Sequence, residues 1–115
     1  MALLAGACAA KPPAPEGSQV ASDLRDPAAL ERGRRIFMGT CTGYCHAAQG
    51  SSSSEAPDLF DCDWLHGGSD AEIFQTVTRG VPGTLMAGFA GRLDDRDIWR
   101  VIAYLRSASP CKAPG

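Results

Sequence analysis

The segment CTGYCH at residues 41–46 places two cysteines and a histidine within six consecutive positions of a 115-residue chain. The whole sequence contains only 2 histidines and 5 cysteines, so this segment concentrates its thiol and imidazole chemistry. Three residues separate Cys41 from Cys45, and His46 follows the second cysteine directly. Thiols and imidazoles bind metals and metal cofactors, and two thiols also form disulfides. A fold organised by one of these groups is therefore expected.

The rest of the chain predicts a small helical domain. Three segments have apolar residues at helical spacing, and none alternates in the manner of a strand. Helix-starting signals precede them: Asp26 with Pro27, a Ser69–Glu72 capping box, and Asp94. The helices are expected over residues 26–39, 69–80 and 93–107, the first ending at Gly39 and the second at Gly80. Because short helices separated by long loops bury little apolar area, such a domain needs a staple or a cofactor.

The apolar faces of these helices give the expected core. The residues at the required three- and four-residue spacing are Leu30, Gly33 and Phe37 in the first helix, Ile73, Phe74 and Val77 in the second, and Ile98, Val101, Ile102 and Leu105 in the third. Gly33 lowers helix stability by about 1 kcal/mol relative to Ala, so its presence indicates a position where another helix crosses closely.

The N-terminal region has the composition of a leader and linker. MALLAGACAA resembles a bacterial lipoprotein signal in which Cys8 becomes lipidated, which implies export to the periplasm and a membrane anchor. Residues 9–25 are rich in Ala, Pro, Ser and Gly and predict an extended, flexible tether. No segment is long enough to span a bilayer. The expected division is a leader and tether over 1–25, one domain over 26–109 and a tail over 110–115.

The net charge and its distribution limit the kinds of partner that are expected. The net charge of −2 lacks the basic excess typical of nucleic-acid binding. Residues 55–72 contain six acidic residues and no Lys or Arg, whereas arginines flank this block on both sides. Such a dipolar distribution orients a protein against a partner protein. No Ser–His–Asp set, phosphate loop or carboxylate pair indicates a group-transfer enzyme.

The CTGYCH segment itself is compatible with three kinds of group. Covalent haem attachment needs two thiols and a histidine directly after the second, as in C-x-x-C-H. The additional residue here can form a small bulge, since Gly43 adopts unusual backbone angles readily. A haem would also supply the missing core.

Zinc and disulfides are the alternatives to haem. A zinc site would use Cys41, Cys45, Cys62 and either His46 or His66, although adjacent ligands such as Cys45 and His46 coordinate one ion awkwardly. A disulfide-stapled binding module would pair Cys41 with Cys45 and Cys62 with Cys111.

Residues 27–107 resemble the class I, monohaem, mitochondrial-type cytochrome c family. The resemblance comprises Gly33 and Phe37 before the Cys/His motif, the segment PDL after it, a helix before the loop GVPGTLMAGF, and a final helix that carries AYLRS. The segment GGSDAEIFQTVTRGVPGTLMAGF is similar to bacterial cytochromes that accept electrons from periplasmic dehydrogenases, including quinoprotein alcohol dehydrogenases. Three residues between the cysteines, in place of two, depart from the family pattern.

This resemblance implies an all-α cytochrome c fold in which three to five short helices and long loops pack around one covalent haem c. His46 would be the proximal iron ligand and Met86 the distal one, with His66 as the alternative sixth ligand. Cys41 and Cys45 would attach the haem, and a thioether at Cys41 is left open. Gly33 would pack against Tyr104 and Leu105 where the first and last helices cross.

Further roles follow from the same resemblance. The Pro57 carbonyl would accept the free N–H of His46, and Trp64 would donate to a haem propionate. Cys62 and Cys111, left over once haem and lipid are assigned, would pair in an oxidising compartment. The implied protein is a monomeric periplasmic electron carrier, not an enzyme, between a dehydrogenase and a terminal oxidase or another cytochrome. The alternatives are a haem enzyme or sensor with an open distal site, and the haem-free module.

Overall fold

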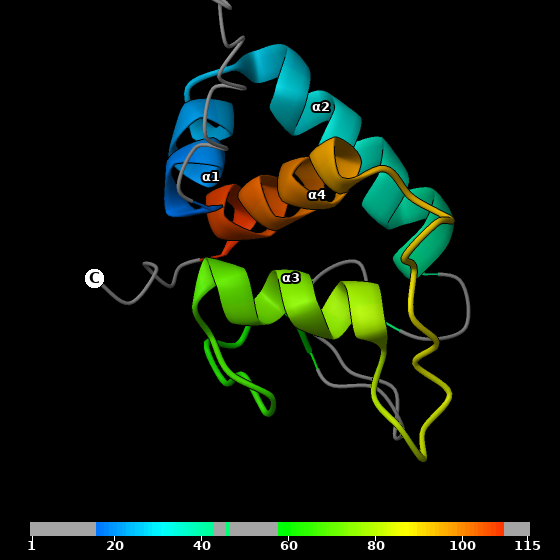
Figure 1. Ribbon diagram of the computed structural model, residues 1–115. Helices are drawn as coiled ribbons and strands as arrows, with labels where there is room; N and C mark the ends of the chain where they lie inside the picture. Colours follow the sequence, from blue (N-terminus) through cyan, green and yellow to red (C-terminus); the bar gives the residue numbers. More distant parts are fainter. Residues whose placement is uncertain (1–15, 43–45, 47–57, 110–115) are drawn as a thin grey trace, which may run out of the picture.

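The computed structural model describes residues 16–42, 46 and 58–109. These residues form α-helices and one π-helix, with no strand and only two isolated β-bridges, so the predicted all-α class is confirmed. In Figure 1, α4 runs through the centre, with α1 and α2 packed on one side and α3 on the other. The elements are α1 (Glu16–Leu24), α2 (Pro27–Ile36), η1 (Phe37–Cys41), α3 (Asp70–Arg79) and α4 (Asp95–Ala108).

The predicted helix starts are confirmed. The Asp26 side chain accepts a hydrogen bond from the N–H of Ala28 at 3.0 Å, and Asp94 caps α4 through the N–H of Arg96 at 3.2 Å. Ser69 and Glu72 form both hydrogen bonds of a capping box. These side chains satisfy N–H groups that the first turn of a helix leaves without partners.

The crossing of α2 and α4 depends on Gly33. A Cβ atom at this position would overlap the carbonyl oxygen of Arg100 and lie 3.1 Å from the Cβ of Tyr104. Only glycine therefore lets the two backbones approach this closely. The predicted contact between Gly33 and Tyr104 is confirmed, and the closest neighbour is the Arg100 backbone.

The core consists of two apolar clusters on either side of α4. The first joins α1, α3 and α4, and Trp99 stacks on Phe74 with ring centroids 4.1 Å apart. The second joins the end of α2 to residues 59–60 and α4. Trp64 packs against both clusters. The buried members are Val20, Ile73, Ile98, Trp99, Ile102 and Ala103 in the first cluster, and Phe37, Phe60, Val101 and Leu105 in the second.

The prediction of an extended tether is wrong for its second half, because residues Glu16–Leu24 form α1. Val20 and Asp23 lie on one face of α1 and are 2% and 1% exposed. Val20 enters the first core cluster, and Asp23 accepts hydrogen bonds of 3.0 and 3.1 Å from Arg96 on α4. Residues 9–15 lie outside the described part, and the proposed domain boundary at residue 26 stays a prediction.

The prediction that Gly39 ends the first helix is also wrong. The helical conformation continues past Gly39 as the π-helix η1, which ends at Cys41. The N–H of Thr42 donates to the carbonyl of Phe37 at 3.1 Å, a hydrogen bond between residues five apart. Gly39 is exposed, and a Cβ atom at this position would have no neighbour within 4 Å. The surrounding structure therefore does not require a glycine here.

Candidate functional site

Cys41 is the last residue of η1, and the backbone of His46 lies beside it. The backbone N–H of His46 donates to the carbonyl of Cys41 at 2.9 Å, and both residues are half-buried. This hydrogen bond holds the backbone of the motif's histidine against that of its first cysteine. Cys45 lies outside the described residues.

An aromatic cluster fixes this end of the helix. Phe37 is fully buried, with its ring centroid 5.6 Å from that of Phe60 and 5.7 Å from that of Tyr104. Cys41 packs against the same cluster. The side chain that anchors η1 therefore lies four residues before the first cysteine of the motif, and it limits how this segment can rotate.

The loop between α3 and α4 carries Met86 and is folded back along the end of α3. The N–H of Val81 donates to the carbonyl of Met86 at 2.9 Å, and the N–H of Phe89 donates to the carbonyl of Val77 at the same distance. Gly80 adopts a φ of 75°. A Cβ at Gly88 would lie 2.5 Å from the carbonyl oxygen of Thr78, so the loop needs a glycine at both positions.

This loop holds the predicted distal ligand in a defined backbone position. Figure 1 shows it as the yellow segment that leaves the end of α3 and returns to α4. Met86 is half-buried, and its N–H donates to the hydroxyl of Thr84 at 3.1 Å. The neighbouring Leu85 is 83% exposed, and Leu65, in the segment before α3, is 72% exposed.

Trp64 is backed by a buried arginine that the sequence reasoning missed. The guanidinium of Arg106, on α4, lies 5.6 Å from the Trp64 ring centroid, and its side chain is only 6% exposed. Arg106 forms an ion pair of 2.9 Å with Asp70 and donates to the carbonyl of Gly68. Since Arg106 follows Ile102 by four residues, the helical spacing of α4 does place it on the buried face.

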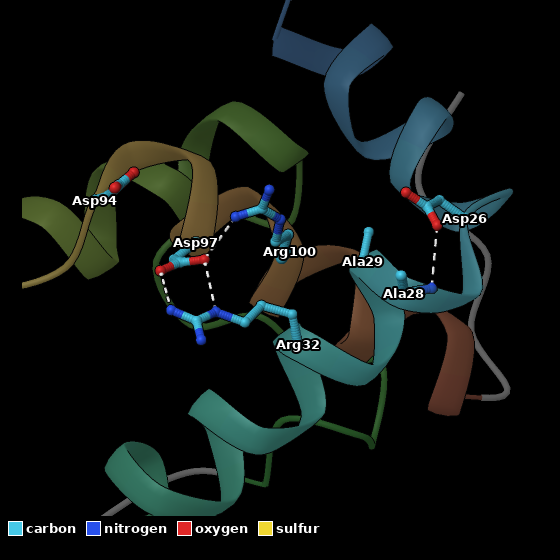
Figure 2. Close-up of a pocket in the computed structure, with 7 residues that line it drawn as sticks. All are labelled: Asp26, Ala28, Ala29, Arg32, Asp94, Asp97 and Arg100. Carbon is cyan, nitrogen blue, oxygen red and sulfur yellow. Dashed lines mark hydrogen bonds and ion pairs between the residues drawn. The ribbon is translucent and has the colours of Figure 1, made fainter.

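A separate pocket of about 380 Å³ lies between the first turns of α2 and α4, and none of the predicted site residues lines it. Figure 2 shows Arg32 and Arg100 pointing toward Asp97 there, with hydrogen bonds of 2.7 to 3.2 Å. The Arg32 hydrogen bond, aided by that of Arg100, holds the pKa of Asp97 below its usual value. These ion pairs tie α2 to α4. The pocket is lined by Asp26, Ala28, Ala29, Arg32, Asp94, Asp97 and Arg100.

The remaining predicted residues are placed only in part. His66 is exposed in the segment before α3. Cys62 is disulfide-bonded, and because Cys111 lies outside the described residues, the pairing of these two stays a prediction. Pro57 and Cys8 also lie outside the described part. In the described ranges, no three His, Cys, Asp or Glu side chains gather as a metal-binding group.

Comparison with known proteins decides the family. The family model described as cytochrome C oxidase, cbb3-type, subunit III, matches residues 28–105. The chain belongs to this family. It is 38% identical over 93 residues to the cbb3-type cytochrome c oxidase subunit CcoP of Rubrivivax gelatinosus, covering 80% of this chain and 30% of that protein. Over 95 residues it is 38% identical to subunit FixP of Azorhizobium caulinodans, covering 76% of this chain and 31% of the relative.

A solved structure shows the same fold. The fold matches cytochrome CL of the marine methylotroph Methylophaga aminisulfidivorans with a TM-score of 0.65 and 26% sequence identity, over 73% of this chain and 57% of that one. The predicted cytochrome c fold is therefore confirmed. The chain spans less than a third of the length of the two subunits above, 30% and 31%.

The chain is thus a cytochrome c domain, which implies a covalently bound haem c. Its residues fit this cofactor. A thiol, an imidazole and a thioether, the groups that c-type haem uses, occur at Cys41, His46 and Met86, and each of these residues is half-buried. None of the described helices is both long enough and apolar enough to cross a membrane.

Proposed function

We propose that this domain is a monohaem, class I cytochrome c that carries single electrons in the periplasm, with His46 and Met86 as the axial ligands of its iron. The observation that carries the proposal is that a cytochrome c fold contains Cys41 at the end of η1, with the His46 backbone hydrogen-bonded to it, and Met86 in a glycine-dependent loop. When bound, the haem supplies an iron that alternates between the ferrous and ferric states.

The chain's own residues define how that iron behaves. His46 would supply the proximal imidazole, and the Pro57 carbonyl would accept its other ring N–H and orient the ring. Met86 would supply a thioether, which raises the reduction potential relative to a second histidine. With both residues bound to the iron, no position would be left for a substrate. Trp64, whose ring lies beside the Arg106 guanidinium, would donate its indole N–H to a propionate.

The names of the relatives favour an oxidase as the redox partner. The similar subunits belong to cbb3-type cytochrome c oxidases, so we propose electron exchange with a terminal oxidase or another respiratory cytochrome. A dehydrogenase, including the quinoprotein type, is the proposed electron donor. We propose a monomeric domain, in which α1 packs against residues 26–109, tethered to the membrane through lipidated Cys8.

An absorption spectrum tests this function. The chain is expressed together with a cytochrome c maturation system, and the purified reduced protein is mixed with carbon monoxide. The expected result is a covalent haem whose spectrum does not change with the gas, because Met86 occupies the sixth position. A colourless folded protein would contradict the function as a whole. Rapid carbon monoxide binding would instead support a haem sensor or enzyme with an open distal site.

A further inference from the structure

Arg106 is a buried cation near the end of α4. Its side chain is 6% exposed, and that of its partner Asp70, in the first turn of α3, is 15% exposed. The Nε and Nη2 atoms of Arg106 lie 3.0 and 2.9 Å from the same oxygen of Asp70, and Nη2 also donates to the carbonyl of Gly68. Because the guanidinium is planar and rigid, these hydrogen bonds fix both its position and its plane.

The fixed guanidinium lies over the indole ring of Trp64. Its central carbon is 5.6 Å from the ring centroid, within the range of a cation–π contact. A Cβ atom at Gly68 would lie 2.8 Å from Cδ1 of Trp64, so the residue that accepts the Arg106 hydrogen bond also touches the indole. The ring packs against both core clusters as well. Arg106 and Gly68 therefore leave the indole little freedom to move.

Stability alone does not explain the Asp70–Arg106 pair. A buried ion pair is often no more stabilising than apolar side chains of the same volume, since removing two charges from water offsets their attraction. In the other ion pairs of α4 in the described part of the chain, the arginine side chain is 29% to 59% exposed. Arg106 differs from those arginines in its burial and in its contact with Trp64. This contact indicates that the pair orients the indole ring.

Trp64 links the ion pair to the end of η1, because Trp64 and Cys41 pack against the same second core cluster. We propose that Arg106, oriented by Asp70, is a positioning residue that holds the Trp64 indole in place and thereby raises the reduction potential of the domain. The inference rests on the proposed function, in which Trp64 donates its N–H to a haem propionate. A propionate charge stabilises ferric iron, and a hydrogen bond to the propionate offsets part of that charge, so a displaced indole lowers the potential.

Two charge-conserving variants test the position of the indole. Arg106→Lys keeps the cation but loses the planar set of donors, and Asp70→Glu keeps the carboxylate but moves it by one methylene group. The sequence has 2 tryptophans, so nitrogen-15 NMR of the reduced, haem-loaded protein shows two indole N–H signals, and Trp64→Phe assigns them. We expect both variants to shift the Trp64 signal. The signal of Trp99, whose ring stacks on Phe74, is the internal control and should stay unchanged.

Reduction potentials show whether Arg106 acts through Trp64. We expect Arg106→Lys and Trp64→Phe each to lower the potential, and the double variant to have the potential of Trp64→Phe alone. Because both single substitutions conserve charge, a direct electrostatic effect on the iron does not contribute to these shifts. Arg100→Lys is the matched control. It makes the same exchange at an arginine that pairs with Asp97 on the same helix, and it should leave the potential unchanged.

An unchanged Trp64 signal and an unchanged potential in both Arg106→Lys and Asp70→Glu would overturn the inference and leave the proposed function intact. Additive shifts of Arg106→Lys and Trp64→Phe would overturn it too, since Arg106 would then act independently of the indole. If Arg106→Lys does not mature, Asp70→Glu in the native and Trp64→Phe backgrounds makes the same comparison. A chain that matures without haem overturns the proposed function and the inference with it.

Discussion

Asp23 on α1 and Arg96 on α4 form a paired hydrogen bond of 3.0 and 3.1 Å although 73 residues separate them in the sequence. The Asp23 side chain is 2% exposed, whereas that of Arg96 is 43% exposed. This pair and the buried Val20 attach α1 to the core. The helix that precedes the family match at residue 28 is thus part of the packed domain.

Replacing Asp23 should loosen this attachment. Asp23→Asn leaves the Arg96 guanidinium without a carboxylate partner, and we expect the free energy of unfolding to fall by about 1–3 kcal/mol. Urea unfolding followed by circular dichroism measures the change. Ser22→Ala, on the exposed side of the same helix, is the control and should change stability little. Equal stability of the two variants would show that α1 contributes nothing through Asp23.

The crossing of α2 and α4 predicts that alanine substitutions at Gly33 and at Gly39 have different effects on stability. Gly33→Ala places a Cβ against the Arg100 carbonyl, and we expect a loss of about 1–3 kcal/mol, the usual effect of overpacking. Gly39→Ala has nothing within 4 Å of its new Cβ and should be neutral or slightly stabilising. The midpoint of thermal unfolding distinguishes them. A Gly33 variant as stable as the Gly39 variant would rule out the close crossing.

The Asp97 ion pairs predict a pH dependence of stability. Arg32, with Arg100, lowers the pKa of Asp97 in the folded state, so the carboxylate stabilises the fold above its unfolded pKa of about 3.9 and loses that effect as pH falls through the folded value. Asp97→Asn should therefore cost about 1–2 kcal/mol at pH 7. The difference from the native protein should shrink below about pH 3.9.

Urea unfolding at neutral and acid pH measures this dependence. Asp95→Asn is the matched control, because Asp95 is an exposed carboxylate in the same first turn of α4. A difference between Asp97→Asn and the native protein that stayed constant from pH 7 to below about pH 3 would contradict the role of the charged carboxylate.

Met86→Ala tests the distal ligand. Because the loop is held by backbone hydrogen bonds, we expect the variant to fold and keep its haem, but to show a lower reduction potential and to bind carbon monoxide. Leu85→Ala, next to it and 83% exposed, is the control and should retain the six-coordinate spectrum. If the potential of Met86→Ala does not change, His66→Ala becomes the decisive variant.

Local hydrogen-bond signals explain what the sequence could predict. The caps at Asp26, Ser69 and Asp94 depend on neighbouring residues alone, and the close approach at Gly33 followed from an unfavourable glycine inside a helix. The helix α1 could not be predicted in this way, because its two large apolar residues, Val20 and Leu24, are too few to give a repeating pattern, and the helix is stabilised by its contact with α4.

The candidate site was likewise predicted from the sequence only in part. The Cys/His motif and the glycine-bracketed Met86 identified the expected ligands directly from the sequence. The π-helix was missed because the apolar spacing ends at Phe37 and gives no signal for the turns that follow. Arg106 was missed because its partner, Asp70, lies 36 residues away, so no local signal shows that a charged residue on the buried face of α4 is paired inside.

The backbone of the Met86 loop has a consequence for the speed of electron exchange. A carrier loses time and driving force when its coordination sphere must rearrange as charge arrives or leaves. Here the carbonyl of Met86 accepts a hydrogen bond from the N–H of Val81, and glycines at positions 80 and 88 allow the loop to pack closely against the end of α3. With Met86 as the proposed distal ligand, its sulfur would stay in place in both oxidation states, so each transfer would involve little structural reorganisation.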